Sequence, residues 1–301
     1  MDPLSLLWLF FILASLQPAV TRQLLLFQRR AALASISRQR GSTVITVIHR
    51  QESLSLLGFP LMRFIDIDDA ESVLMAIHET PQGRPIDIVL HTPGGMVLAA
   101  QQIAAALADH EGRVTAIVPH YAMSGGTLIA LAADEIVVDA HAALGPVDPQ
   151  LGRYPAASIV EVTERPGDHD DQTLIMADVG RKAIAQVEGF TMRMLERHMS
   201  AERAREAARL LATGVWTHDH PLQVPELQML GLPVTVGVPQ RVRDLMTLYP
   251  QPRGRPPAVE YVPGPPGPSI PRRREAPSAP RPAPAQSSSD GASRRRLVRR
   301  P

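Results

Sequence analysis

The stretch Ile86-Asp-Ile-Val-Leu-His-Thr-Pro-Gly-Gly-Met96 carries an apolar run directly into a pair of glycines. Its Ile, Val and Leu residues at 86–91 are typical of a buried strand, and the small apolar residues of 96–108 predict a helix. Two glycines let the backbone turn sharply between these elements and leave the amide N–H groups at the helix N-terminus unobstructed. Such amides suit an anion, so this turn is a first candidate for a functional loop.

Strand-like and helix-like segments alternate in the same way over residues 41–239. The predicted strands are 43–49, 86–91, 113–119 and 135–138, and the predicted helices are 69–79, 96–108, 124–133, 172–198 and 201–212. Strands that alternate with helices predict an α/β fold with a largely parallel sheet. We expect residues 41–249 to form the folded domain.

A second glycine pair follows a serine in Met123-Ser-Gly-Gly126, again where a predicted strand gives way to a helix. A serine at that place can simply cap the helix. It can also be a nucleophile, because the glycine amides beside it would approach a substrate closely. A third loop, Ala143-Leu-Gly-Pro-Val-Asp-Pro-Gln150, follows the next predicted strand.

Composition and missing motifs exclude several kinds of chemistry. The chain has no cysteine, so it forms no disulfide, thiolate nucleophile or cysteine-bound zinc site. It also lacks the Walker A lysine motif, GxGxxG and the zinc motif HExxH. Asp66, Asp68 and Asp69 are expected to begin a helix rather than to bind calcium. We therefore expect no metal and no cofactor.

Lys182 is the only lysine of the chain, and the other thirty basic residues are arginine. Drift towards arginine would leave it as an ordinary surface residue. However, a lysine can lose its proton when buried, whereas an arginine stays charged, so a single retained lysine is also a candidate general base.

The N-terminal residues predict a membrane anchor. Residues 4–20 are apolar and uncharged, at the lower length limit for a membrane span. Arginines follow from Arg22 to Arg40, which by the positive-inside rule would place the rest of the chain in the cytoplasm. A cleaved signal peptide is the alternative, although Asp2 stands where a positive segment is expected. We expect 1–21 to be a transmembrane helix and 22–40 a basic juxtamembrane segment.

The C-terminal residues 250–301 are dense in Pro, Arg, Ser and Ala. They hold 11 arginines against 3 acidic residues, a net charge of +8, which leaves residues 1–249 with about −7. A segment of this composition cannot bury a core and is expected to be disordered. Its arginine clusters would suit anionic lipid or nucleic acid, but a solvated tail is the simpler interpretation.

The order of these loops resembles the Clp protease/crotonase superfamily. Within it, the chain is most similar to the membrane-associated serine dehydrogenase proteinase family, which is related to signal peptide peptidase A. The resemblance covers roughly residues 25–250. It is carried by Val47-Ile-His-Arg-Gln51, Ile65-Asp-Ile-Asp68, Val118-Pro-His-Tyr-Ala-Met-Ser-Gly-Gly126, Leu144-Gly-Pro-Val-Asp-Pro-Gln150 and Trp216-Thr-His-Asp219.

The resemblance implies a Clp/crotonase-like fold of repeated ββα units that assembles into a homo-oligomer, a trimer or a multiple of it. It also implies that Ser124 is a nucleophile and that the Gly95 and Gly125 amides form an oxyanion hole. This assignment agrees with the residues, because a tetrahedral oxyanion needs two preorganised donors and each glycine loop can supply one.

The base is less clearly indicated. Clp-type proteases use a histidine about 25 residues after the serine, but no histidine stands at 147–150. Relatives of signal peptide peptidase A use a lysine from a later helix, and Lys182 lies 58 positions after Ser124. His120 and His141 are the alternatives. A free lysine has a pKa of about 10.4, so a lysine base must be desolvated, and pairing with Asp178 one turn earlier would oppose this.

The sequence therefore predicts a membrane-anchored, cytoplasm-facing serine endopeptidase with a Ser124–Lys182 dyad, acting on polypeptides without ATP. One alternative is an inactive membrane scaffold of the same fold, with an inert serine and an exposed Lys182. A crotonase-like acyl-CoA enzyme is the other alternative. The serine in the second loop argues against it, because such enzymes carry no essential serine there.

Overall fold

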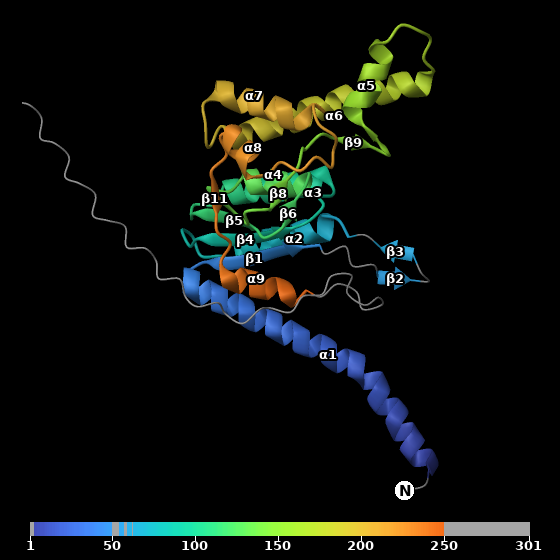
Figure 1. The fold of residues 1–301 in the computed structure, drawn as a ribbon, viewed down its shortest axis with the longest axis vertical. Coiled ribbons are helices and arrows are strands. Elements are labelled where there is room, and N and C mark those ends of the chain that lie inside the picture. Colours follow the sequence, from blue (N-terminus) through green and yellow to red (C-terminus); the bar gives the residue numbers. More distant parts are fainter. Residues whose placement is uncertain (1–2, 50–53, 57–58, 62, 250–301) are drawn as a thin grey trace, which may run out of the picture. The chain divides into compact units, whose positions relative to one another are not determined.

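A parallel sheet forms the centre of the protein (Figure 1). The computed structural model describes residues 3–49, 54–56, 59–61 and 63–249. Five strands pair in the order β1-β4-β5-β7-β11, and each neighbouring pair is parallel. They are β1 (Thr43–Ile48), β4 (Ile86–His91), β5 (Val114–Val118), β7 (Glu135–Val138) and β11 (Val234–Val236). The predicted α/β fold with a parallel sheet is confirmed.

The remaining elements are short strand pairs and helices. The short strands are β2 (Leu54–Leu56), β3 (Phe59–Leu61), β6 (Tyr121–Ala122), β8 (Ala143–Leu144), β9 (Gln150–Leu151) and β10 (Tyr154–Pro155). The helices are α1 (Pro3–Arg40), α2 (Ile67–His78), α3 (Val97–Ala108), α4 (Gly125–Leu131), α5 (Ala156–Glu164), α6 (Asp171–Leu195), α7 (Ala201–Ala212), α8 (Val224–Met229) and α9 (Gln240–Thr247).

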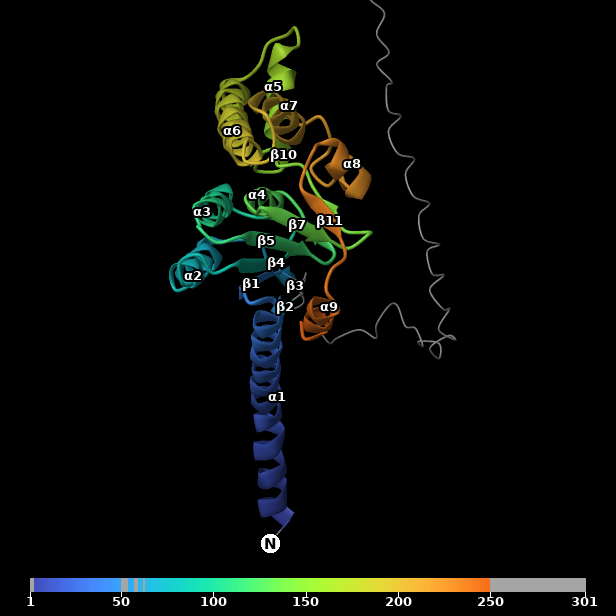
Figure 2. The ribbon, with the colours of Figure 1, turned by 90° about the vertical axis from the view of Figure 1, so that its left-hand side faces the viewer.

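Helices cover both faces of the sheet. Because side chains alternate along a strand, Ile88 and Leu90 of β4 join the core under α2, α3 and α4, whereas Val89 packs on the opposite face. Ile36 of α1 and Leu245 of α9 belong to that second cluster. Figure 2 shows α2, α3 and α4 on one side of the sheet and α9 on the other.

A helical layer formed by α5, α6 and α7 packs over α4 (Figure 1). Val187, Phe190 and Leu195 of α6 continue the larger core, and His198 Nε2 lies 3.1 Å from the Leu131 carbonyl at the end of α4. Helix α6 and His198, which follows it, therefore attach this layer to α4, the helix that begins directly after Ser124.

Sequence patterns located the main elements but missed α5. Its sequence is rich in β-branched residues, which disfavour a helix when the segment is considered alone. The helix forms against α6, where a Cβ added to Gly180 would lie 3.2 Å from the Ala156 carbonyl oxygen. Tertiary packing thus overrides local preference at this position.

Residues 1–21, predicted to be a membrane anchor, fall largely outside the side chains that the structure describes. The backbone of Pro3–Arg40 is one helix. Among the described residues, no helix combines the length and the apolar character needed to cross a bilayer. The anchor stays a prediction, as does the cytoplasmic location. The predicted tail, 250–301, lies outside the described residues.

Candidate active site

The two glycine loops meet at the carboxyl ends of neighbouring strands, where parallel α/β sheets form their sites. β4 runs into Thr92 and the first glycine pair, and the segment after β5 runs into Ser124. Two backbone hydrogen bonds of Thr92 join the loops. Its amide donates to the Tyr121 carbonyl at 3.2 Å, and its carbonyl accepts from the Met123 amide at 2.9 Å. The predicted loops are thereby brought side by side.

Ser124 has a strained backbone. Its φ of 50° is the only positive value at a non-glycine residue in the described part of the chain, and its ψ is −116°. Such conformations cost about 1–3 kcal/mol and persist where the surroundings impose them, often at functional sites. Its side chain makes no capping hydrogen bond to α4. The interpretation of Ser124 as a helix cap is therefore not supported.

The loop after β4 needs glycines because other backbone approaches it closely. A Cβ on Gly94, whose φ is +106°, would lie 2.7 Å from the Ser124 Cβ. A Cβ on Gly95 would lie 2.7 Å from the Ile65 Cα. Ile65 also holds the loop by two hydrogen bonds of 2.8 Å, from its amide to Gly94 and from the Met96 amide to its carbonyl.

The Gly95 and Gly125 amides are available to a ligand. Within the described residues neither N–H group donates to a protein acceptor. The Gly94 carbonyl is turned to Ile65, so the N–H group of the same peptide points the opposite way. Gly125 begins α4, where amides have no partner in the helix. A Cβ on Gly125 would lie 3.5 Å from the Gly95 nitrogen, so the two donors are close.

Lys182 is not joined to Ser124 in this chain. Its side chain is 68% exposed, and its ammonium donates to Asp178 at 2.5 Å. That hydrogen bond and the charge of Lys182 hold the pKa of Asp178 below its usual value. The pairing expected to oppose a lysine base is therefore present, and the dyad stays a prediction.

The Ser124 hydroxyl makes no hydrogen bond to either alternative histidine within the described residues. His120 is exposed, and its ring lies 5.4 Å, edge on, from the ring of His91. His141 is also exposed, and its backbone amide donates to Asp139 at 3.3 Å.

Two histidine–carboxylate pairs, each with one buried member, escaped the sequence analysis. His49 lies 3.1 Å from Asp69 and 3.0 Å from Thr92. His218 Nδ1 lies 2.8 Å from the almost fully buried Asp148, which also accepts from Gln150. All these histidines and carboxylates stand in or beside the segments that carry the resemblance. Their place in these segments was the only sign of the pairs in the sequence, because spacing along the chain does not reveal contacts between distant residues.

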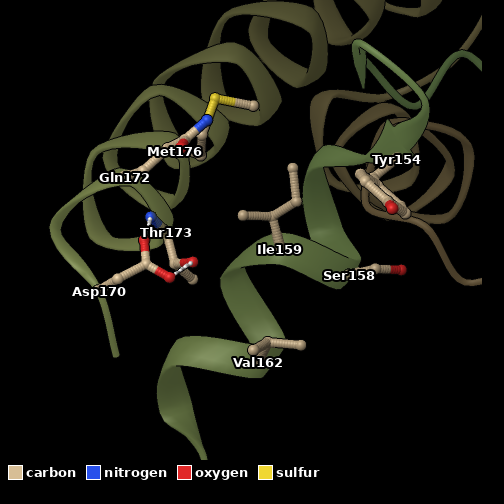
Figure 3. A pocket seen from close by; sticks show the side chains of 8 residues that line it. All are labelled: Tyr154, Ser158, Ile159, Val162, Asp170, Gln172, Thr173 and Met176. Atoms are coloured by element: carbon tan, nitrogen blue, oxygen red, sulfur yellow. Dashed lines mark hydrogen bonds between the residues drawn. The ribbon is translucent and has the colours of Figure 1, made fainter. Parts of the chain in front are cut away.

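A pocket of about 380 Å³ lies between α5 and α6, apart from the glycine loops (Figure 3). Apolar side chains of Ile159, Val162 and Met176 line it, with Asp170 and Thr173 at its polar side. None of the predicted site residues contributes to it. In the described part of the chain, no group of three or more His, Asp or Glu side chains is placed to hold a metal ion.

The parallel sheet, the strained serine at a helix N-terminus and the two amides without a partner among the described residues are features expected of a serine hydrolase with a backbone oxyanion hole. The comparison with protein families agrees with this class. Residues 1–275 match the family of ClpP-like SDH-type serine proteinases, and the chain belongs to that family.

Two relatives come from Methanocaldococcus jannaschii. The uncharacterized protein MJ0137 is 50% identical over 273 residues, 88% of this chain and 96% of the relative. The uncharacterized protein MJ1495 is 49% identical over 259 residues, 86% of this chain and 89% of the relative. A solved membrane-bound stomatin-specific protease, 1510-N, is 17% identical, with a TM-score of 0.41 over 68% of this chain and 82% of its own.

Proposed function

We propose that the chain is a serine endopeptidase with Ser124 as its nucleophile and the Gly95 and Gly125 amides as its oxyanion hole. One observation carries this proposal. A strained serine, with no cap bond of its own, stands beside two close amides that have no acceptor among the described residues. Membership of a serine proteinase family supports the same chemistry.

The reaction follows from this geometry. The Ser124 oxygen attacks a peptide carbonyl while a base takes the hydroxyl proton. The carbonyl oxygen becomes an oxyanion that accepts from Gly95 and Gly125, and one such donor typically contributes about 2.7–4 kcal/mol. The intermediate then expels the amine, which takes the proton from the base, and water releases the acyl group by the same steps.

We propose Lys182 as that base, acting in an assembled form of the protein. On α6 it shares an exposed face with Leu174, Ile175 and Val179, which are 46%, 63% and 42% exposed. Covering this apolar face in an oligomer would remove water from the amine and favour its neutral form. The lysine would also have to leave Asp178. An N-terminal membrane anchor, which would bring polypeptides near the bilayer within reach, remains part of the proposal.

Cleavage of an unfolded protein such as casein tests these roles. The full-length wild type should cleave it, and Ser124→Ala and Lys182→Met should each lose at least about a thousandfold in rate. Arg181→Met is the matched control, because it removes the neighbouring charge on the same helix and should retain activity. Activity in Lys182→Met would show that Lys182 is not the base and would leave His120 and His141 as the candidates. An inactive wild type would favour the scaffold or the acyl-CoA enzyme.

A further inference from the structure

We propose that His49 and Asp69 form a positioning pair that acts through Thr92 to hold the glycine loop against Ser124. This inference rests on the function proposed above and assigns it two residues that never touch substrate. It arises from a chain of hydrogen bonds that begins in the first turn of α2 and ends at the Gly94 amide.

His49 follows β1 and is 5% exposed. Its Nδ1 lies 3.0 Å from the Thr92 hydroxyl, and its Nε2 lies 3.1 Å from Asp69. Both ring nitrogens are therefore paired with a different side chain. Since each nitrogen has one fixed partner, the ring connects the carboxylate to the hydroxyl and has no other orientation that satisfies both.

A continuous chain of hydrogen bonds runs from Asp69 through His49 and Thr92 to Gly94. Burial alone would raise the pKa of Asp69, but hydrogen bonds from His49 and the Asp66 amide hold it below its usual value. The carboxylate is thus an acceptor for His49 Nε2, and the Thr92 hydroxyl lies within hydrogen-bond distance of His49 Nδ1 and, at 3.4 Å, of the Gly94 carbonyl oxygen. The Thr92 oxygen in turn accepts from the Gly94 amide at 3.2 Å.

Thr92 connects the His49–Asp69 pair to both glycine loops. It is fully buried, and its backbone is bonded to Tyr121 and to Met123, the residue before Ser124. A shift of Thr92 would therefore change the spacing between the Gly95 and Gly125 donors. Catalysis is sensitive to this spacing, because a displacement of about 1 Å can cost about a hundredfold in rate.

Asp69 links the same loop to α2 by a second route. In a capping box, its carboxylate accepts from the Asp66 amide at 3.1 Å, and the Asp66 carboxylate accepts from the Asp69 amide at 3.0 Å. Ile65, which precedes Asp66, makes the two backbone hydrogen bonds to the glycine loop, one to Gly94 and one from Met96. The Asp69 carboxylate thus supports the glycine loop by two routes, one through His49 and Thr92 and the other through Asp66 and Ile65.

The test compares the rate constants of four full-length variants with casein-derived peptide as substrate. Thr92→Val removes the hydroxyl, and Thr92→Ser restores it without the methyl group. His49→Asn breaks the link to Asp69. His198→Asn is the matched control, because the His198 ring is hydrogen-bonded to the Leu131 carbonyl, at the end of α4 away from Ser124. Thermal unfolding is measured for each variant in parallel.

We expect Thr92→Val and His49→Asn to lower kcat by about ten- to a hundredfold with little change in KM. Thr92→Ser should recover most of the wild-type kcat, and His198→Asn should lose thermal stability only. Wild-type kcat in Thr92→Val, or no recovery in Thr92→Ser, would overturn the inference while the peptidase stands. An inactive wild type would overturn both.

Discussion

Gly94 and Ser124 are so close that a Cβ added to Gly94 would lie 2.7 Å from the Ser124 Cβ. The strand-to-helix turn after β4 and the turn after β6 thus touch at these two residues. Their contact sets the distance between the nucleophile and the Gly95 amide, and it explains why the first of the paired glycines accepts no side chain.

Gly94→Ala should therefore lose stability and activity together. Both the overlap with Ser124 and the φ of +106° disfavour alanine, and we expect a loss of about 2–4 kcal/mol in the free energy of unfolding. Gly83→Ala separates the two causes, because Gly83 has a φ of +72° but an added Cβ there would meet nothing within 4 Å. Its loss should stay at about 1–2 kcal/mol. Equal losses in urea denaturation would contradict the close contact.

Replacement of Ser124 by glycine should give a more stable protein than its replacement by alanine. A glycine adopts a φ of 50° without the steric cost that a side chain incurs. Ser124→Gly should gain about 1 kcal/mol in the free energy of unfolding over Ser124→Ala, and both variants should be inactive. The two midpoints in urea give the comparison directly. A less stable glycine variant would show that Ser124 is not strained.

The stability of the protein should depend on Asp69 at acid pH. The pKa of this carboxyl is lowered in the folded state, so the stability that it contributes is present above about pH 4, its unfolded pKa. That contribution is lost as the pH falls through the lower folded pKa. Asp69→Asn should weaken the dependence of the melting temperature on pH below pH 5. Asp68→Asn, on the exposed side of α2, should leave that dependence as in the wild type. Identical slopes would refute this role.

Arg40 ties the end of α1 to the sheet. Its guanidinium donates to the buried Asp87 at 2.6 and 2.8 Å, and Ser42 donates to the same carboxylate. Arg40→Ala would leave that carboxylate without its cation and should cost about 3 kcal/mol. Arg113→Ala, which breaks the exposed pair with Glu135, should cost less than about 1 kcal/mol. Similar losses in urea denaturation would contradict the difference in burial.

Much of the fold could be predicted from local patterns. The bounds of β4, β7 and α7 agree with the prediction, because continuous apolar runs and helical spacing are strong where an element is buried or strongly amphipathic. Helix α5 could not be predicted, since its β-branched residues become helical only against α6. Local preference fails where packing between distant segments decides the structure.

Some residues of the candidate site could likewise be predicted from the sequence, and others could not. Ser124, Gly95 and Gly125 stand in short loops whose glycines are visible in the sequence, and the structure brings them together. The bond from His49 to Thr92 spans 43 positions, so no spacing indicated it. For Lys182, the spacing of four residues to Asp178 did indicate the ion pair that the structure contains.

The most direct test of the central claim is fluorophosphonate labelling of the purified full-length protein, with the modified residue located by mass spectrometry. An activated serine beside an oxyanion hole predicts one phosphonylated residue, Ser124, and no labelling in Ser124→Ala. Labelling of another serine, or equal labelling of wild type and Ser124→Ala, would contradict the assignment of Ser124 as the nucleophile.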